Sequence, residues 1–232
     1  MTETRRTSFD AEVEIPVSDL VLPGTLTVPA DADGLVIFAH GSGSSRQSPR
    51  NRLVAEKLNQ SGLATLLFDL LTSAEETADS YDARLRFDVP LLSDRLVAVT
   101  DWVAAFPPAH GLPLGYFGAS TGAAAALVAA AARPALVEAV VSRGGRPDLA
   151  EFALARVKAP TLLIVGARDR SVLLLNRQAQ RQLTAANELE VVPAATHLFE
   201  EAGKLEEVAA LAASWFTGNL ARQPMEAPAR NR

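Results

Sequence analysis

Short apolar runs alternate with helix-like segments along most of this chain. Two of the runs, residues 35–39 and 64–68, are apolar almost without a break, which is typical of strands covered on both faces in a parallel sheet. In the intervening segments, apolar residues recur on one side of a helix. The alternation predicts an α/β fold with a doubly wound, mostly parallel sheet. The predicted strands of this sheet are 35–39, 64–68, 112–117, 138–141, 161–165 and 189–192, and the predicted helices are 49–60, 91–105, 123–132, 172–184 and 205–220.

The segments outside this alternation complete the predicted organisation. Apolar and polar residues alternate in 11–15 and 25–28, which predicts a pair of edge strands joined by a turn at the Leu-Pro-Gly of 22–24. Residues 70–87 are predicted to be a long acidic loop, the best candidate for a pocket wall or flap. Residues 141–160 leave room only for a short helix, so we expect no large cap domain.

We expect a single domain over residues 1–221. The chain has 232 residues, of which 48% are hydrophobic, and an α/β domain of this size can bury one large core. Residues 222–232 are polar and contain proline, so we expect a disordered tail there.

The net charge and the missing residue types exclude several kinds of function. The net charge is −5, from 27 acidic and 22 basic side chains, which argues against a general nucleic-acid binder. There is no cysteine, so disulfides, thiolate catalysis and cysteine-based metal sites are excluded. The longest apolar run, 123–132, is too short to span a membrane. We therefore expect a cytoplasmic protein without a nucleic-acid or membrane partner, and without a cofactor or metal.

Residues 118–122 carry the strongest chemical signal. They read Gly-Ala-Ser-Thr-Gly, directly after a predicted strand and directly before a predicted helix. In this strand–turn–helix context a G-x-S-x-G motif exposes its serine as a nucleophile. The two glycines allow strand and helix to approach closely around a strained residue. Ser120 is therefore the candidate nucleophile.

A serine nucleophile needs a base, and the chain has only three histidines. His40 ends a predicted strand and His110 lies in a turn, whereas His197 follows the last predicted strand. Catalytic groups in open parallel sheets gather at the carboxyl ends of the strands. His197 is therefore the candidate base, and a surface histidine is the alternative reading.

The base in turn needs an acid that orients it. Asp169 follows a predicted strand and lies between Ser120 and His197 in the chain, in the order nucleophile, acid, base that this architecture uses. Helix capping is its alternative role. Two rival acids fit less well, because Asp69 precedes the nucleophile and Asp148 is explained equally well by capping.

Two backbone N–H groups are expected to stabilise the oxyanion. One belongs to Thr121, the residue after the nucleophile, and the other belongs to Ser42 in the glycine-rich segment 40–45. The same segment could cradle a phosphate, but it lacks the lysine of a P-loop and the spacing of a dinucleotide-binding motif.

The chain resembles the α/β-hydrolase superfamily over nearly its whole length, and within it the small, cap-less hydrolases related to dienelactone hydrolase. The resemblance rests on His-Gly-Ser-Gly-Ser-Ser at 40–45, the motif at 118–122, Gly-Ala-Arg-Asp at 166–169 and Thr-His at 196–197. It implies Ser120 as nucleophile, Asp169 as acid, His197 as base, and Ser42 and Thr121 as oxyanion donors.

Two further points limit what the resemblance implies. Dienelactone hydrolases carry a cysteine nucleophile, which this chain lacks, so dienelactone is not implied as the substrate. Segments 67–72 and 142–145 also resemble uncharacterised members that are joined to phosphoribosyltransferase domains, and we expect no such domain within these 232 residues.

The substrate side is less defined. Arg143 follows a predicted strand, and we expect it to contact either a substrate carboxylate or a loop acid such as Asp69. A structural ion pair or a solvated arginine is an equally good reading. Without a cap the pocket should be open, which favours small esters. Arg143 and Asp69 are thus the candidate substrate-binding residues.

The predicted function is that of a serine hydrolase that cleaves small carboxylic esters through an acyl-enzyme. A thioesterase, peptidase or perhydrolase with the same triad is one alternative, and an inactive hydrolase fold used for binding is another. The expected partner is a small-molecule ester. The sequence leaves the oligomeric state open between monomer and homodimer.

Overall fold

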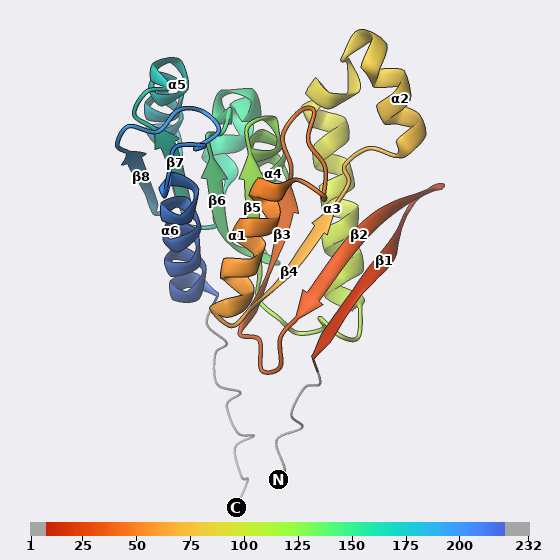
Figure 1. Ribbon diagram of the computed structural model, residues 1–232. Helices are drawn as coiled ribbons and strands as arrows, with labels where there is room; N and C mark the ends of the chain where they lie inside the picture. The colour runs from red at the N-terminus through yellow and green to blue at the C-terminus, as the bar shows by residue number, and fades with distance from the viewer. Residues whose placement is uncertain (1–7, 221–232) are drawn as a thin grey trace, which may run out of the picture.

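An eight-stranded sheet forms the centre of the protein. The computed structural model describes residues 8–220, and Figure 1 shows helices on both sides of this sheet. The strand order is β1-β2-β4-β3-β5-β6-β7-β8, with antiparallel pairing of β2 to both β1 and β4 and parallel pairing elsewhere. The predicted doubly wound, mostly parallel sheet is thus confirmed. The strands are β1 (Phe9–Val17), β2 (Leu20–Val28), β3 (Gly34–Ala39), β4 (Leu63–Phe68), β5 (Leu114–Ala119), β6 (Val137–Arg143), β7 (Thr161–Gly166) and β8 (Asn187–Val192).

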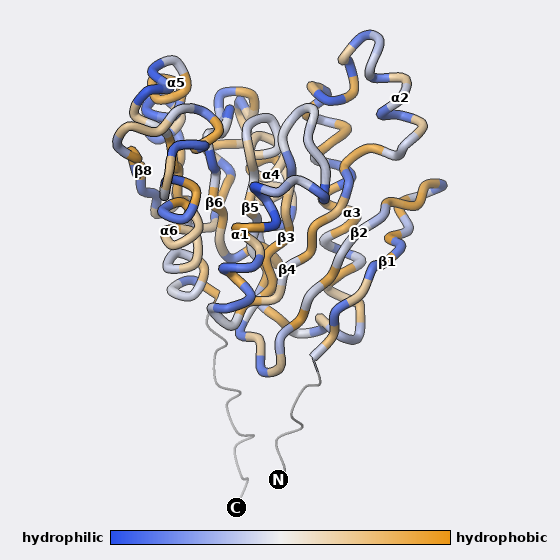
Figure 2. The backbone as a smooth tube through the Cα atoms, in the orientation of Figure 1, coloured by the Kyte–Doolittle hydropathy of each residue, from blue (hydrophilic) through white to orange (hydrophobic). Residues whose placement is uncertain are grey.

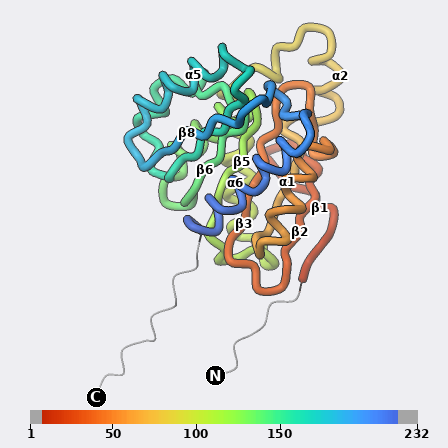
Figure 3. The backbone as a smooth tube through the Cα atoms, turned by 60° about the vertical axis from the view of Figure 1, so that its left-hand side comes forward, coloured from red at the N-terminus to blue at the C-terminus, as the bar shows by residue number. Residues whose placement is uncertain are grey.

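Helices cover the two faces of the sheet unequally. Figures 1 and 3 show α1 and α6 side by side on one face, and α3, α4, α5 and the 3₁₀ segment η2 pack against the other. Two hydrophobic clusters, one on each face, form the core. The helical segments are α1 (Pro49–Gln60), α2 (Ser73–Asp82), η1 (Leu85–Phe87), α3 (Val89–Ala105), α4 (Thr121–Ala132), η2 (Pro147–Arg156), α5 (Arg170–Gln180) and α6 (Lys204–Asn219).

The burial of the central strands explains their apolar sequences. Every residue of β3, β4, β5 and β7 is buried, because helices cover both sides of these strands. Figure 2 shows the central strands as mainly apolar along their length. The edge strand β8 instead alternates between exposed and partly buried residues. The continuous apolar runs therefore predicted the middle of the sheet correctly.

The turn predicted at 22–24 is wrong. The hairpin turns at Ser18, which has a φ of 53°, and Asp19, while Pro23 and Gly24 lie inside β2. Gly24 is closely packed there, because a Cβ at this position would lie 3.1 Å from Ile15 Cδ1 and 3.2 Å from Val13 Cγ2. The Pro-Gly pair therefore reflects close packing between strands and not a change of chain direction.

The loop predicted at 70–87 is also wrong, since most of it is helical. Thr72 and Glu75 form a capping box at the start of α2, in which each side chain bonds the other residue's backbone N–H. Glu75 also pairs with the buried Arg95 of α3. The buried Asp79 of α2 pairs with Arg86 of η1. Glu75 and Asp79 are therefore paired, and they stabilise this helical segment.

The Glu75–Arg95 pair should make the stability of the fold depend on pH. Hydrogen bonding to Arg95 lowers the pKa of Glu75 from 4.5 to about 2. Its contribution is therefore complete above the unfolded pKa of 4.5 and is lost as the pH falls toward 2. We expect Glu75→Gln to lower the free energy of unfolding by about 2–3 kcal/mol at neutral pH. Urea unfolding at pH 7 and pH 3 measures this loss, which should be smaller at pH 3. The control Glu138→Gln changes an exposed residue of β6 and should match wild type at both pH values. A loss of stability in Glu75→Gln that is the same at pH 7 and pH 3 would contradict this account.

The remaining boundaries differ from expectation by a few residues. β5 begins at Leu114, two residues later than predicted, and α5 ends at Gln180, four residues earlier. The stretch 141–160 contains only the short η2, and residues 8–220 include no large cap domain. The predicted tail 222–232 lies outside the described residues. In the described part of the chain, no helix is both long and apolar enough to cross a membrane.

Candidate active site

Ser120 sits at the apex of a strained turn between β5 and α4. Its φ of 50° and ψ of −120° are sterically unfavourable for a residue with a Cβ. Both neighbouring glycines are required, because a Cβ at Gly118 would lie 2.4 Å from Ala123 Cα and one at Gly122 would lie 2.2 Å from Ala39 O. The strand and the helix thus meet around the serine as the motif predicts.

His197 and Asp169 are paired at the same edge of the sheet. His197 Nδ1 lies 2.6 Å from Asp169 Oδ2. Because a carboxylate can only accept, Nδ1 carries the proton and Nε2 is left as the basic nitrogen. Asp169 is also the N-cap of α5, where its other oxygen accepts a hydrogen bond from Val172 N at 3.5 Å. Asp169 therefore contacts His197 and caps α5 at the same time.

The end of β6 brings Ser120 and His197 near each other. Ser120 N donates a hydrogen bond to Arg143 O at 3.2 Å. The next residue, Gly144, has a φ of 51° and lies against the imidazole, since a Cβ there would be 3.5 Å from His197 Nδ1. Within residues 8–220 the Ser120 hydroxyl itself makes no hydrogen bond. Ser120 and His197 thus lie on either side of the end of β6, next to Arg143 and Gly144 respectively.

The two predicted oxyanion donors lie next to each other. Thr121 is the first residue of α4, so its N–H has no acceptor within the helix. Ser42 N donates to the Thr121 hydroxyl oxygen at 3.0 Å. Gly41 passes close to the nucleophile, as a Cβ there would lie 3.1 Å from Ser120 Cβ. The sequence did not predict that the Thr121 hydroxyl accepts a hydrogen bond from the N–H of Ser42.

The other two histidines are placed elsewhere. His40 is buried, which lowers the pKa of its imidazole, and Leu70 N donates to its Nε2 at 3.0 Å. Its Nδ1 lies 3.0 Å from Gly41 O, so the neutral ring ties the end of β3 to the end of β4. His110 is exposed and precedes β5, at the end of the strand opposite Ser120. Neither ring is available as a base for Ser120.

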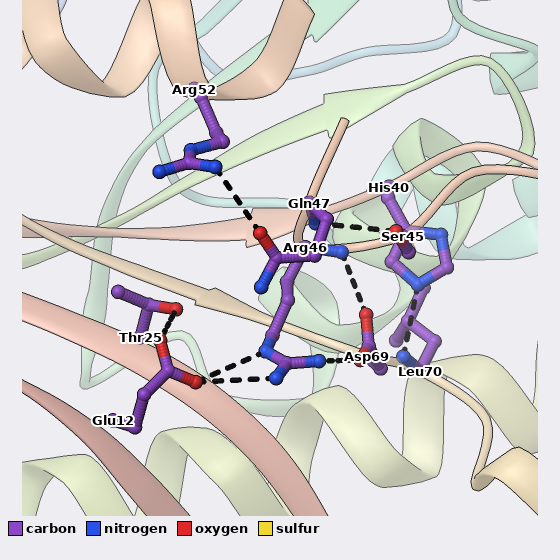
Figure 4. Close-up of polar contacts among 9 residues, drawn as sticks. All are labelled: Glu12, Thr25, His40, Ser45, Arg46, Gln47, Arg52, Asp69 and Leu70. Carbon is purple, nitrogen blue, oxygen red and sulfur yellow. Dashed lines mark hydrogen bonds and ion pairs between the residues drawn. The ribbon is translucent and has the colours of Figure 1, made fainter. Parts of the chain in front are cut away.

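Asp69 is engaged by an arginine other than Arg143. Its Oδ1 accepts from Arg46 N at 2.7 Å and its Oδ2 pairs with Arg46 Nη1 at 2.5 Å, as Figure 4 shows. Arg46 also pairs with Glu12 of β1 at 3.2 Å, and Thr25 of β2 donates to Glu12 at 2.6 Å. This network ties the loop before α1 to the β1–β2 hairpin. The rival acid Asp148 pairs with Arg146 in the same way.

Arg143 is buried without a counter-charge. Only 7% of the residue is exposed, and its Nε and Nη1 have no hydrogen-bond partner among residues 8–220. Burial, together with the charge of Arg50, lowers the pKa of Arg143 to about 10. The predicted pairing of Arg143 with Asp69 is not formed.

A cavity of about 510 Å³ opens next to Ser120. Thr121, which follows Ser120 in the chain, and Gly41 and Ser42 form part of its wall. The segment 70–87 supplies another part, so this segment does line a pocket even though it is helical. The residues of segment 70–87 that line the cavity are Leu70, Leu71, Glu76, Asp79 and Arg86.

Comparison with known proteins agrees with this architecture. A dienelactone hydrolase from Anabaena variabilis has a crystal structure that is 56% identical over 92% of this chain and 99% of that chain, with a TM-score of 0.90. The structure of Est1E from Butyrivibrio proteoclasticus is only 17% identical and shows the shared fold, with a TM-score of 0.74 over 89% of this chain and 98% of that chain.

A longer relative carries a different name. The protein named "Putative phosphoribosyl transferase" of Mycobacterium tuberculosis (strain ATCC 25618 / H37Rv) is 57% identical over 211 residues, which are 91% of this chain and 47% of that protein. The chain thus spans about half the length of the curated relatives it matches. The family described as "Alpha/beta hydrolase domain" matches residues 32–213, and the chain therefore belongs to the α/β-hydrolase family.

Proposed function

We propose that the protein is a serine hydrolase that cleaves small carboxylic esters through an acyl-enzyme. The observation that carries this proposal is the 2.6 Å contact between His197 Nδ1 and Asp169 Oδ2, at the sheet edge where Ser120 occupies a strained turn. Ser120 is partly buried, and a base fixed in one tautomer at the same sheet edge as a serine is the arrangement that activates a hydroxyl for attack.

The first half of the reaction forms the acyl-enzyme. Ser120 Oγ attacks the ester carbonyl carbon while His197 Nε2 takes its proton, and Asp169 stabilises the imidazolium. The carbonyl π electrons move onto the oxygen, which the N–H groups of Ser42 and Thr121 stabilise. As the C–O bond breaks, His197 returns the proton to the departing alcohol.

The second half releases the acid. A water molecule attacks the acyl carbon while His197 takes one of its protons, and the second tetrahedral intermediate collapses with proton return to Ser120 Oγ. Ser120 then carries its proton again, and His197 Nε2 is again free to act as a base.

The oxyanion site must exchange one acceptor for another during this reaction. In the free protein Ser42 N donates to the Thr121 hydroxyl at 3.0 Å. An oxyanion carries more charge than a hydroxyl and accepts a stronger hydrogen bond. We propose that the Thr121 hydroxyl holds the Ser42 N–H in place between turnovers and releases it to the intermediate.

The phosphoribosyl transfer in the name of the curated relatives is not part of this proposal. The chain spans 47% of those proteins, and the contact between His197 and Asp169 near Ser120 supports acyl transfer. Thioester, peptide and peracid chemistry use the same groups, and no contact in the site favours one of them over ester hydrolysis.

Ester hydrolysis by two serine variants tests the proposal. We expect wild type to hydrolyse p-nitrophenyl acetate with an initial burst of p-nitrophenol, and Ser120→Ala to lose about 10⁴-fold or more in kcat. The control Ser214→Ala changes an exposed serine of α6 and should retain the wild-type rate. Equal rates for Ser120→Ala and wild type, with both proteins folded by circular dichroism, would refute the assignment.

A further inference from the structure

Arg143 is a buried charge that forms no ion pair with any residue in the described part of the chain. It is 7% exposed, and its Nε and Nη1 have no hydrogen-bond partner within residues 8–220. The protein treats its other deeply buried arginine differently, since Arg95 is 4% exposed and bonds both Glu75 and Leu70 O. An unpaired buried guanidinium costs stability, so Arg143 calls for a partner that residues 8–220 do not supply.

Arg143 lies directly beside the turn that holds Ser120. Arg143 is the last residue of β6, it pairs with Ala119 of β5, and its carbonyl accepts the N–H of Ser120. Val141, two residues earlier, belongs to the core on the α1 and α6 side. Because alternate residues of a strand share a face, Arg143 lies on that side too.

A second arginine lies on the same side. Arg50 is in the first turn of α1 and lines the cavity together with Gly41, Ser42 and Thr121. It is close enough for its charge to lower the pKa of Arg143. Its Nη1 contacts the exposed Glu200 at 3.3 Å, while its Nε is buried without a partner. Two cations that repel each other, and that both retain free donors, form a site suited to an anion.

The acidic residues near the cavity do not fill this site. Asp69 is held by Arg46, and Asp79 by Arg86. Glu76 belongs to α2, and burial and the charge of Asp69 raise the pKa of its carboxyl. None of the three forms an ion pair with Arg143 or Arg50.

We propose that Arg143 and Arg50 form an anion subsite beside Ser120, and that the natural ester carries a carboxylate or phosphate group that binds there. This inference rests on the proposed ester hydrolysis and names its substrate class. Binding the charged group at the subsite would fix the distance between the anchored group and the carbonyl carbon attacked by Ser120. Esters of matching length should therefore be preferred over neutral ones.

Matched ester pairs test the selectivity. Mono-p-nitrophenyl adipate and p-nitrophenyl hexanoate share their leaving group and chain length but differ in the terminal charge. On the alcohol side, 4-acetoxybenzoate and 4-acetoxyphenyl phosphate can each be compared with 4-acetoxybenzamide. We expect wild type to have at least about a tenfold higher kcat/KM for the anionic member of one pair. The pair that shows this identifies which part of the ester carries the charge, and whether it is carboxylate or phosphate.

Substitution of the arginines should remove that selectivity. We expect Arg143→Gln to lower the anionic-to-neutral ratio of kcat/KM by about 10- to 100-fold, the range for losing one partner of a charge-assisted hydrogen bond. Arg50→Gln should lower it less, because its side chain is a third exposed. Arg177→Gln changes the net charge equally at an exposed position of α5 and should leave the ratio at the wild-type value.

Thermal unfolding separates this role from a structural one. Removing an unpaired buried charge should raise the unfolding midpoint of Arg143→Met and Arg143→Gln by a few degrees. If Arg143 instead stabilised the fold, both variants would unfold at lower temperature, and Arg143→Lys, which keeps the charge, would be the variant closest to wild type in stability.

A binding measurement keeps this inference separate from the catalytic proposal. Monomethyl adipate and phenyl phosphate are titrated calorimetrically into Ser120→Ala and into Ser120→Ala/Arg143→Gln, with methyl hexanoate as the neutral comparison. Binding of either anion that weakens on loss of Arg143 supports the subsite even if wild type hydrolyses no ester. Hydrolysis by wild type without anion preference, and without an effect of Arg143→Gln, would overturn the subsite and leave the serine hydrolase proposal standing.

Discussion

Asp169→Asn should lower kcat for p-nitrophenyl acetate by about 10⁴-fold while leaving the protein folded. Asp169 Oδ2 accepts from His197 Nδ1 at 2.6 Å and so fixes the tautomer of the ring. An asparagine can turn its NH₂ group toward Nδ1, which then loses its proton and leaves Nε2 protonated and unable to act as a base. Stability should hardly change, because asparagine caps a helix as well as aspartate does.

Asp148 provides the matched control for this substitution. It lies in the first turn of η2 and forms an ion pair with Arg146 at 2.7 Å. We expect Asp148→Asn to retain wild-type kcat. If Asp169→Asn also retained it, with its fold intact, Asp169 would be a capping residue only, and the acid of the triad would have to be sought elsewhere.

Gly122→Ala should be the most destabilising small substitution in the active-site turn. The added Cβ would lie 2.2 Å from Ala39 O and 2.4 Å from His40 O, which are backbone atoms that cannot move aside. We expect a loss of about 3 kcal/mol or more in the free energy of unfolding, and with it poor recovery of folded protein. Chemical denaturation monitored by tryptophan fluorescence measures this loss.

Gly218→Ala in α6 is the control for the effect of alanine itself. A Cβ at Gly218 would meet no atom within 4 Å. Because alanine is the better helix former, we expect this variant to be more stable than wild type by up to about 1 kcal/mol. Equal stability of Gly122→Ala and Gly218→Ala would show that α4 can move away from β3, and that the close contact at Gly122 is not required.

The members of the candidate triad can be found from the sequence because each is marked locally. Ser120 follows one predicted strand, and Asp169 and His197 follow two others, so parallel pairing alone brings them to one edge. The structure places Asp169 and His197 in contact as expected. The glycine pattern is only partly local, since a Cβ at Gly118 would meet Ala123 of the motif's own helix, whereas a Cβ at Gly122 would meet Ala39 O of β3.

The errors arose where distant residues decide the structure. Helix α2 depends on Glu75 meeting Arg95, which lies in another helix. The Pro-Gly pair predicts a turn when only its neighbours in the sequence are considered, whereas the structure pairs Gly24 with both β1 and β4. The sequence also does not reveal that Nε and Nη1 of Arg143 lack a hydrogen-bond partner among residues 8–220, because this depends on how distant segments pack.

The most direct test of the central claim is active-site labelling followed by mass spectrometry. Incubation with a fluorophosphonate should add one label to each wild-type chain, and fragmentation should place that label on Ser120. Ser120→Ala should take up none, and Asp169→Asn should react far more slowly than wild type. A folded wild-type protein that takes up no label, or a label found on a residue other than Ser120, would contradict the serine hydrolase assignment.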